Sequence, residues 1–322
     1  MKELCGPATQ RKKGAAMAES TPSAAITPPA IVVVIGLGAM GLPMAARLKL
    51  AGFEVRGVDP QPAAREAFKA KVGAAFASGP EAADNAAAVI TMLPNGRIVR
   101  EALLGAQGIA AKLAAGTPVI DMSSSAPTDT VALAADLAAR GLPLIDAPVS
   151  GGVRRAVDGT LAIMAGGAAE QVERARPLFE AMGKAVFATG PTGSGHAMKA
   201  LNNYVSAAGL VAASEALLVG GRFGLAPETI IDVLNASTGR NNSTEVKMKQ
   251  FVISESFASG FALALMAKDL RIAADLATHL DLDVPQVQSI AAMWERARDA
   301  LPPGADHTEI YRYLAGDGAT KA

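Results

Sequence analysis

Very little in the sequence would support a metal site, a disulfide or a nucleic-acid surface. Cys5 is the only cysteine, so no disulfide can form within the chain. The three histidines, His196, His279 and His307, lack ligand spacing, so we expect no metal. Aromatic residues make up 4% of the chain, and 30 basic side chains balance 30 acidic ones. Nucleic-acid binding favours a basic surface with stacking rings, so we expect no nucleic-acid partner.

Long apolar runs are also missing. Residues 205–221 form the most apolar segment, but they are rich in glycine and alanine and include Glu215. A membrane span needs about 20 apolar residues in a row, so we expect no membrane partner. We interpret this segment as a helix that is buried on all sides inside the protein.

The first 29 residues are rich in alanine, proline, serine and threonine and show no periodic apolar pattern. They also lack the apolar stretch of a secretory signal. We interpret residues 1–29 as a disordered leader that stems from an upstream start codon, with Met17 as the favoured start and an organelle transit peptide as the competing interpretation. We expect the protein to be cytoplasmic.

What the sequence does contain is a regular alternation of strand and helix signals over residues 30–192. The apolar, β-branched run at 30–36 is typical of a central parallel strand, and a helical pattern follows at 42–52. Further strands are predicted at 54–59, 87–93, 117–123, 142–150, 159–167 and 184–190. This alternation predicts an α/β fold with a doubly wound parallel sheet.

From residue 193 the pattern becomes purely helical. Helices are predicted at 226–237, 259–280 and 284–301, and no run alternates with period two. A chain of 322 residues is long enough for two domains. We therefore expect a dinucleotide-binding domain at 30–192 and an all-helical domain at 193–322 that begins with the interdomain helix.

The first strand ends in a glycine-rich turn that leads directly into a helix. Such a turn can bind a pyrophosphate, because its glycines allow a tight bend and a close backbone approach, and the helix N-terminus attracts negative charge. Asp59 ends the next strand and can accept hydrogen bonds from ribose hydroxyls while repelling a 2′-phosphate. This favours NAD over NADP. The residues of the turn are Gly36, Leu37, Gly38, Ala39, Met40 and Gly41.

A second glycine-containing loop follows the strand at 142–150. Ser150, Gly151 and Gly152 stand beyond its carboxyl end, which is the side where ligands bind in open α/β sheets. Backbone N–H groups and the serine hydroxyl can hold a carboxylate. The alternative is a flexible turn without a ligand.

Lys199 and Asn203 share one face at the start of the interdomain helix, flanked by Asn202 and Ser206. Polar groups at the entrance to so apolar a helix are costly unless they face a cleft. A partly shielded lysine has a lowered pKa and can exchange a proton with an alcohol during hydride transfer. The alternative is that Lys199 extends to solvent and Asn203 caps or bridges a loop.

Lys268 and Asp269 interrupt another apolar helix. Either they pair with surface neighbours, or Lys268 closes over the cofactor from the second domain, and the pattern does not distinguish these.

Taken in order, these segments resemble the β-hydroxyacid dehydrogenase family, which includes 3-hydroxyisobutyrate dehydrogenase, tartronate semialdehyde reductase and relatives of 6-phosphogluconate dehydrogenase. The resemblance extends over residues 31–315 and implies a Rossmann domain followed by a helical domain, usually as a dimer or tetramer. The matching blocks are GLGAMGLPMAARL, MLP, IDMSS, DAPVSGGVRRAVDGTLAIMAGG, GSGHAMKALNN and KDL.

Residue by residue, the resemblance implies that Lys199 is the proton donor and acceptor and that Asn203 orients the substrate. It implies that residues 150–152 hold the substrate carboxylate. It also assigns the nicotinamide half of the cofactor site to Leu93, Pro94, Ser124 and Lys268.

The expected reaction is hydride transfer between NAD and the hydroxyl-bearing carbon of a small, 3-hydroxyisobutyrate-like β-hydroxy acid. The segment SGGVRRAVDGTL is more similar to 3-hydroxyisobutyrate dehydrogenases than to tartronate semialdehyde reductases. Two alternatives remain open: a reductase of a small semialdehyde or of an imine on the same scaffold, and a nucleotide-binding protein without chemistry.

Overall fold

The computed structural model describes residues 24–316, so residues 1–23 of the predicted leader lie outside the described residues. The described chain packs against the fold before residue 30. Ile26 is buried in the core, and its N–H donates a hydrogen bond to the carbonyl of Arg174 (2.9 Å). The predicted boundary at residue 30 is therefore too late, because a single apolar anchor has no periodicity to reveal it.

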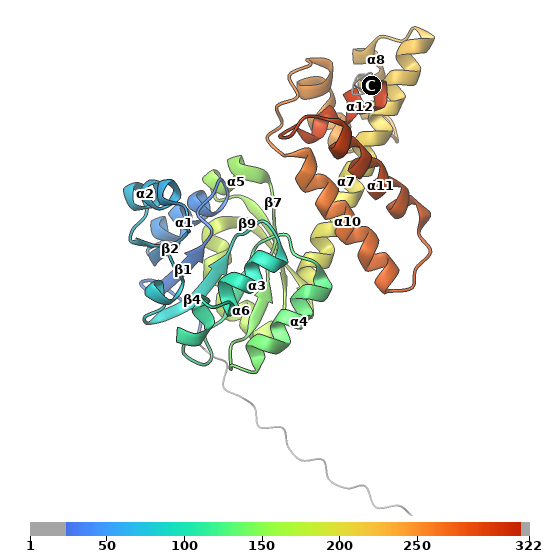
Figure 1. The fold of residues 1–322 in the computed structure, drawn as a ribbon. Coiled ribbons are helices and arrows are strands. Elements are labelled where there is room, and N and C mark those ends of the chain that lie inside the picture. The colour runs from blue at the N-terminus through green and yellow to red at the C-terminus, as the bar shows by residue number, and fades with distance from the viewer. Residues whose placement is uncertain (1–23, 317–322) are drawn as a thin grey trace, which may run out of the picture.

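The N-terminal part is built on one sheet with the strand order β3-β2-β1-β4-β5-β6-β8, in which β7 and β9 also pair with β8 (Figure 1). The first six strands are parallel. The strands are β1 (Ile31–Ile35), β2 (Glu54–Val58), β3 (Ala75–Phe76), β4 (Ala86–Thr91), β5 (Val119–Asp121), β6 (Leu144–Asp146), β7 (Val149–Ser150), β8 (Leu161–Gly166) and β9 (Gly183–Gly190).

The last two strands differ from the prediction of a wholly parallel sheet. β8 runs antiparallel to β6 and β7, and β9 then runs parallel to β8. The connection between β7 and β8 contains only the short helix α5 (Gly152–Asp158). A connection this short lets the chain return beside the strand it has just left, whereas parallel neighbours need a longer crossover.

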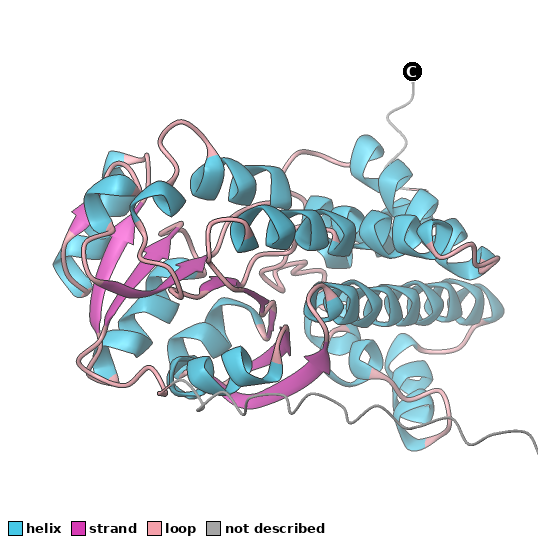
Figure 2. Cartoon of the chain, turned by 90° about the horizontal axis from the view of Figure 1, so that it is seen from below, coloured by secondary structure: helices cyan, strands magenta, loops and turns pink. Residues whose placement is uncertain are grey.

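Helices cover both faces of the sheet (Figure 2). Alternate residues of β1 enter two different cores: Val32 and Val34 pack with α1 and α6, while Val33 and Ile35 pack with α3 and α4. This is why the strand is apolar on both sides. The helices of this part are α1 (Gly41–Leu50), α2 (Pro62–Lys71), α3 (Gly96–Leu104), α4 (Pro127–Ala138), α5 and α6 (Ala169–Met182).

The C-terminal part is helical, as predicted, and its core surrounds the fully buried Trp294. Four α-helices of the described residues begin with a proline, whose missing N–H costs nothing at that position. The helices here are α7 (Ser194–Phe223), α8 (Pro227–Ala236), α9 (Asn242–Val246), α10 (Leu263–His279), α11 (Pro285–Ala300) and α12 (Ile310–Ala315), with a π-helical turn at Met248–Ile253 and 3₁₀ turns including His307–Glu309.

The long helix α7 is not buried on all sides, contrary to the prediction. Its 30 residues extend about 45 Å, and its neighbours cover only one side. Val205, Val219 and Phe223 are 68%, 71% and 84% exposed. By length and composition alone α7 would also pass as a membrane span, but its other side, with Ala207 and Leu210, packs in the helical core.

Candidate active site

The glycine turn between β1 and α1 has the geometry that a phosphate-binding turn requires. Gly36 has φ +97°, a conformation that side chains disfavour. A Cβ added to Gly41 would overlap the carbonyl oxygen of Gly36, so strand and helix can approach this closely only with glycine there. A Cβ on Gly38 would meet nothing within 4 Å, which leaves open space beside the exposed backbone at the helix entrance.

Asp59, at the end of β2, is tied to this turn. Its Oδ2 accepts a hydrogen bond from the N–H of Leu37 (2.9 Å), and its Oδ1 accepts one from the N–H of Gln61 (2.8 Å). The guanidinium of Arg65 donates to the carbonyls of Asp59 and Pro60, both at 2.8 Å. The carboxylate is thus held beside the turn.

A cavity of about 1200 Å³ runs along this edge of the sheet. Gly36 and Asp59 line it, and so do Leu93, Pro94 and Ile98 beyond β4. Small-molecule sites typically measure about 300–1,000 Å³. The cavity therefore has room for an extended dinucleotide, and the open backbone at Gly38 together with the placement of Asp59 fits such a cofactor.

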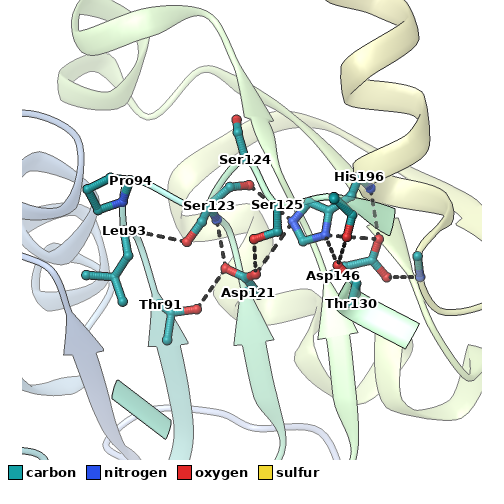
Figure 3. A network of polar contacts seen from close by, with 12 residues as sticks. Thr91, Leu93, Pro94, Asp121, Ser123, Ser124, Ser125, Thr130, Asp146 and His196 are labelled. Atoms are coloured by element: carbon teal, nitrogen blue, oxygen red, sulfur yellow. Dashed lines mark hydrogen bonds and ion pairs between the residues drawn. The ribbon is translucent and has the colours of Figure 1, made fainter. Parts of the chain in front are cut away.

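The loops after β4 and β5 are linked by a buried network around Asp121 (Figure 3). The Asp121 carboxylate accepts hydrogen bonds from the Thr91 hydroxyl (2.9 Å), the Ser123 N–H (3.0 Å) and the Ser125 hydroxyl (2.9 Å). The N–H of Leu93 in turn donates to the Ser123 Oγ (2.9 Å). These bonds fix the segments that carry the predicted nicotinamide contacts.

Lys268 joins the helical part to these loops. Its ammonium donates to the carbonyl of Ser124 (2.6 Å) and, more distantly, to that of Pro94 (3.4 Å). Lys268 thus pairs with the neighbouring Asp269 (3.1 Å) and also reaches the loops after β4 and β5, and its role toward a cofactor stays a prediction.

The start of α7 is anchored to the sheet by Asp146. Its carboxylate accepts hydrogen bonds from the N–H groups of Gly193 (2.7 Å) and His196 (2.9 Å). The buried His196 ring bonds the Thr130 hydroxyl (2.8 Å) and the Ser123 carbonyl (3.2 Å) (Figure 3). Burial raises the pKa of Asp146, and the nearby His196 opposes that shift. The helix entrance therefore has a fixed position relative to the cofactor loops.

Lys199 and Asn203 lie just beyond this anchor, where the two parts meet. Asn203 is buried, and its Nδ2 donates to Asp269 Oδ2 (2.6 Å), while Asp269 Oδ1 pairs with the Lys268 ammonium (3.1 Å). Burial lowers the pKa of Lys199, the charge of Asp269 opposes that shift, and the charge of Lys268 adds to it. An amine with a lowered pKa gives up its proton more readily than an ordinary lysine.

The loop at Ser150, Gly151 and Gly152 follows β7, the strand at the end of the sheet's strand order. Gly151 and Gly152 have φ values of +132° and +67°, so the turn needs glycine at both positions. Ser150 pairs with Ala162 on β8, the strand against which α7 packs. Among the described residues, no hydrogen bond links this loop to Lys199 or Asn203.

Sequence reasoning missed two features of this region. The first is the hydrogen bond between Asn203 and Asp269. In the sequence Asp269 is only a charged residue in an apolar helix, and nothing there indicates that it binds Asn203. Lys247 was not singled out at all, yet its ammonium donates to the Ser206 hydroxyl (3.0 Å) on the face of α7 that carries Asn203. Its position depends on the path of the chain after α8, which no local pattern encodes. Within residues 24–316, no group of His, Cys, Asp or Glu is arranged to hold a metal.

Each of the two parts of the chain matches a known protein-family profile. Residues 31–190 match the profile of the NAD binding domain of 6-phosphogluconate dehydrogenase, and residues 193–314 match the one described as NAD-binding of NADP-dependent 3-hydroxyisobutyrate dehydrogenase. The chain is 37% identical to 2-(hydroxymethyl)glutarate dehydrogenase of Eubacterium barkeri over 82% of its length and 88% of the relative. It is 38% identical to the NAD-dependent L-serine dehydrogenase of Pseudomonas aeruginosa (89% and 93%).

A solved structure agrees with these matches. The 3-hydroxyisobutyrate dehydrogenase of Mycobacterium tuberculosis, solved with L-serine, superposes with a TM-score of 0.82 at 34% identity, covering 88% of this chain and 99% of that one.

Proposed function

Because the chain belongs to the β-hydroxyacid dehydrogenase family, we propose that it transfers a hydride between NAD and the hydroxyl-bearing carbon of a small β-hydroxy acid, similar to 3-hydroxyisobutyrate. Membership makes the chain a nicotinamide-dependent oxidoreductase that acts on hydroxyl groups. The cofactor preference, the substrate and the role of each residue are the parts that we propose.

The observation that carries the proposal is the cluster of Lys199, Asn203, Asp269 and Lys268 opposite the loops at Pro94 and Ser124. Lys199 takes the proton from the substrate hydroxyl during oxidation and returns it during reduction. Asn203 is oriented by Asp269, which accepts from its Nδ2, and by Asn202, whose Nδ2 donates to its Oδ1 (3.2 Å); the second lone pair of that oxygen positions the substrate hydroxyl. Residues 150–152 bind the carboxylate through the serine hydroxyl and backbone N–H groups.

The cofactor lies along the cavity in this proposal. The glycine turn at residues 36–41 holds the pyrophosphate and Asp59 the adenosine ribose, while Leu93, Pro94, Ser124 and Lys268 border the nicotinamide. The nicotinamide, when bound, supplies the hydride acceptor or donor. Two observations support NAD over NADP: Asp59 would repel a 2′-phosphate, and the nearby Arg65 is already engaged by two main-chain carbonyls.

Replacing Lys199 tests the proposal. Lys199→Ala removes the proton exchanger and is expected to lower kcat for 3-hydroxyisobutyrate oxidation about 10³-fold, while NAD binding, measured by calorimetry, is retained. Lys112→Ala, at an exposed lysine far from the cluster, is the matched control and keeps wild-type rates. Near-normal turnover of Lys199→Ala would refute the proton-exchange role.

A substrate panel separates the remaining alternatives. The proposed function requires NAD-linked turnover of small β-hydroxy acids or, in reverse, of their semialdehydes. Turnover of cyclic imines alone would favour an imine reductase, and NAD binding without any hydride transfer would favour a binding protein.

We also propose that the enzyme is a cytoplasmic homodimer or homotetramer without nucleic-acid or membrane partners. The exposed apolar side of α7, with Val205, Val219 and Phe223, is the kind of patch that monomers seldom leave open. A Val219→Lys, Phe223→Lys double variant is expected to sediment as a smaller species than the wild type. A wild type that sediments as a monomer would contradict the proposed oligomer.

A further inference from the structure

The face of α7 that carries Lys199 continues beyond Asn203. Ser206 stands seven residues after Lys199 and three after Asn203, so all three lie on one side of the helix. Seven residues correspond to about 10 Å along the axis. The polar row therefore extends about 10 Å beyond Lys199.

Lys247 binds the last residue of this polar row, Ser206. It follows α9, and its ammonium donates to Ser206 Oγ (3.0 Å). The segment before it is held firmly, because Asn241 and Thr244 form a reciprocal capping box and Ser243 donates to the main-chain carbonyl of Ser206 (3.4 Å). Lys247 thus reaches α7 from a fixed helix end.

The charge of Lys247 is poorly compensated. No carboxylate of the described residues lies within ion-pairing distance of its ammonium, and burial lowers the pKa of Lys247 to about 8, with Asp306 opposing the shift. Asp306 itself is occupied, since its carboxylate accepts hydrogen bonds from Ser259, from the Gly260 N–H and from Thr308. A half-buried cation without a dedicated anion is costly to maintain.

We propose that Lys247 and Ser206 form a subsite for a second anionic group, so that the substrate is a β-hydroxy acid with a carboxylate or sulfonate at its far end. The inference rests on the proposed function, because it places the reacting hydroxyl at Lys199. A chain of four or five carbons spans from Lys199 to this subsite once the reach of the lysine side chain is included. The second anion supplies the charge that Lys247 lacks, and Ser206 adds a hydrogen-bond donor.

The test compares kcat/KM for 2-(hydroxymethyl)glutarate with kcat/KM for 3-hydroxyisobutyrate, which has a methyl group in place of the charged arm. The wild type is expected to favour the dianion. Lys247→Met is expected to lower the ratio of the two values by about tenfold or more, and Lys247→Arg to retain most of it. A sulfonate-bearing analogue, with a sulfonate in place of the distal carboxylate, shows whether the subsite prefers one anion.

Lys249→Met is the matched control. Lys249 lies two residues further along, is exposed and pairs with Asp232, so its substitution leaves the ratio unchanged. A purely structural role of Lys247 would lower both kcat/KM values together and leave their ratio intact. That result, or a wild type that does not favour the dianion, would overturn the proposal.

Binding measurements separate this inference from the proposed function. Calorimetry with glutarate and butyrate in the presence of NAD needs no turnover. Tighter binding of glutarate by the wild type, lost in Lys247→Met, would support the subsite even if no hydroxy acid were oxidised. Equal binding of the two acids would reject the subsite even if 3-hydroxyisobutyrate were a good substrate.

Discussion

The sheet side and the helical side of the junction between the two parts are built in opposite ways. On the sheet side, buried carboxylates are fully engaged: Asp121 accepts three hydrogen bonds and Asp146 two main-chain ones. On the helical side, Lys199 and Lys268 share one carboxylate, Asp269, and the carboxylate that acts on Lys247 is the already occupied Asp306. The sheet side therefore fixes geometry with satisfied groups, while the helical side leaves positive charge that an anionic substrate can neutralise.

A substitution that removes an anchoring carboxylate on the sheet side should have the largest effect, and the effect should be on stability. Asp146→Ala leaves the N–H groups of Gly193 and His196 without an acceptor in a buried place, so we expect the free energy of unfolding to fall by about 3 kcal/mol. Urea denaturation measures this change. Asp158→Ala, at an exposed carboxylate, should change it by less than about 0.5 kcal/mol. Equal stability of the two variants would show that Asp146 does not anchor α7.

A smaller effect is expected at Asp59, whose carboxylate accepts from the glycine turn and lines the cavity. Asp59→Asn keeps an oxygen acceptor for the turn but removes the negative charge that disfavours a 2′-phosphate. The preference for NAD over NADP, taken as a ratio of kcat/KM values, should fall by about tenfold. An unchanged ratio, or a wild type that prefers NADP, would contradict the assignment of Asp59.

The smallest expected effect is a shift in the pH profile on the helical side. Oxidation needs the neutral amine of Lys199, so kcat/KM should rise with pH, and because burial lowers the pKa of Lys199, the midpoint should lie below that of an ordinary lysine. Asp269 opposes the lowering, so Asp269→Asn should move the midpoint to still lower pH. Reduction needs the ammonium and should show the reverse dependence. A midpoint that moves upward in Asp269→Asn would count against this electrostatic account.

The sequence alone predicted the sheet side better than the helical side. The glycine turn, the strand predicted at 30–36 and observed at 31–35, and the acid at Asp59 are local patterns, and the structure places them next to one another. The antiparallel return of β8, the exposed side of α7 and the approach of Lys247 to Ser206 depend on how distant segments pack. Such contacts are absent from any single stretch of residues. The roles of Lys199, Asn203 and residues 150–152 remain predictions that the proposed variants test.

The length of α7 has a mechanical consequence. The helix is fastened to the sheet at its first turn, and Lys199 stands only about 8 Å from that fastening, whereas Phe223 lies more than about 40 Å away. If the rod tilts about its fixed end, the displacement grows in proportion to the distance from the pivot. A displacement of the distal end therefore reaches the Lys199 position reduced about sixfold.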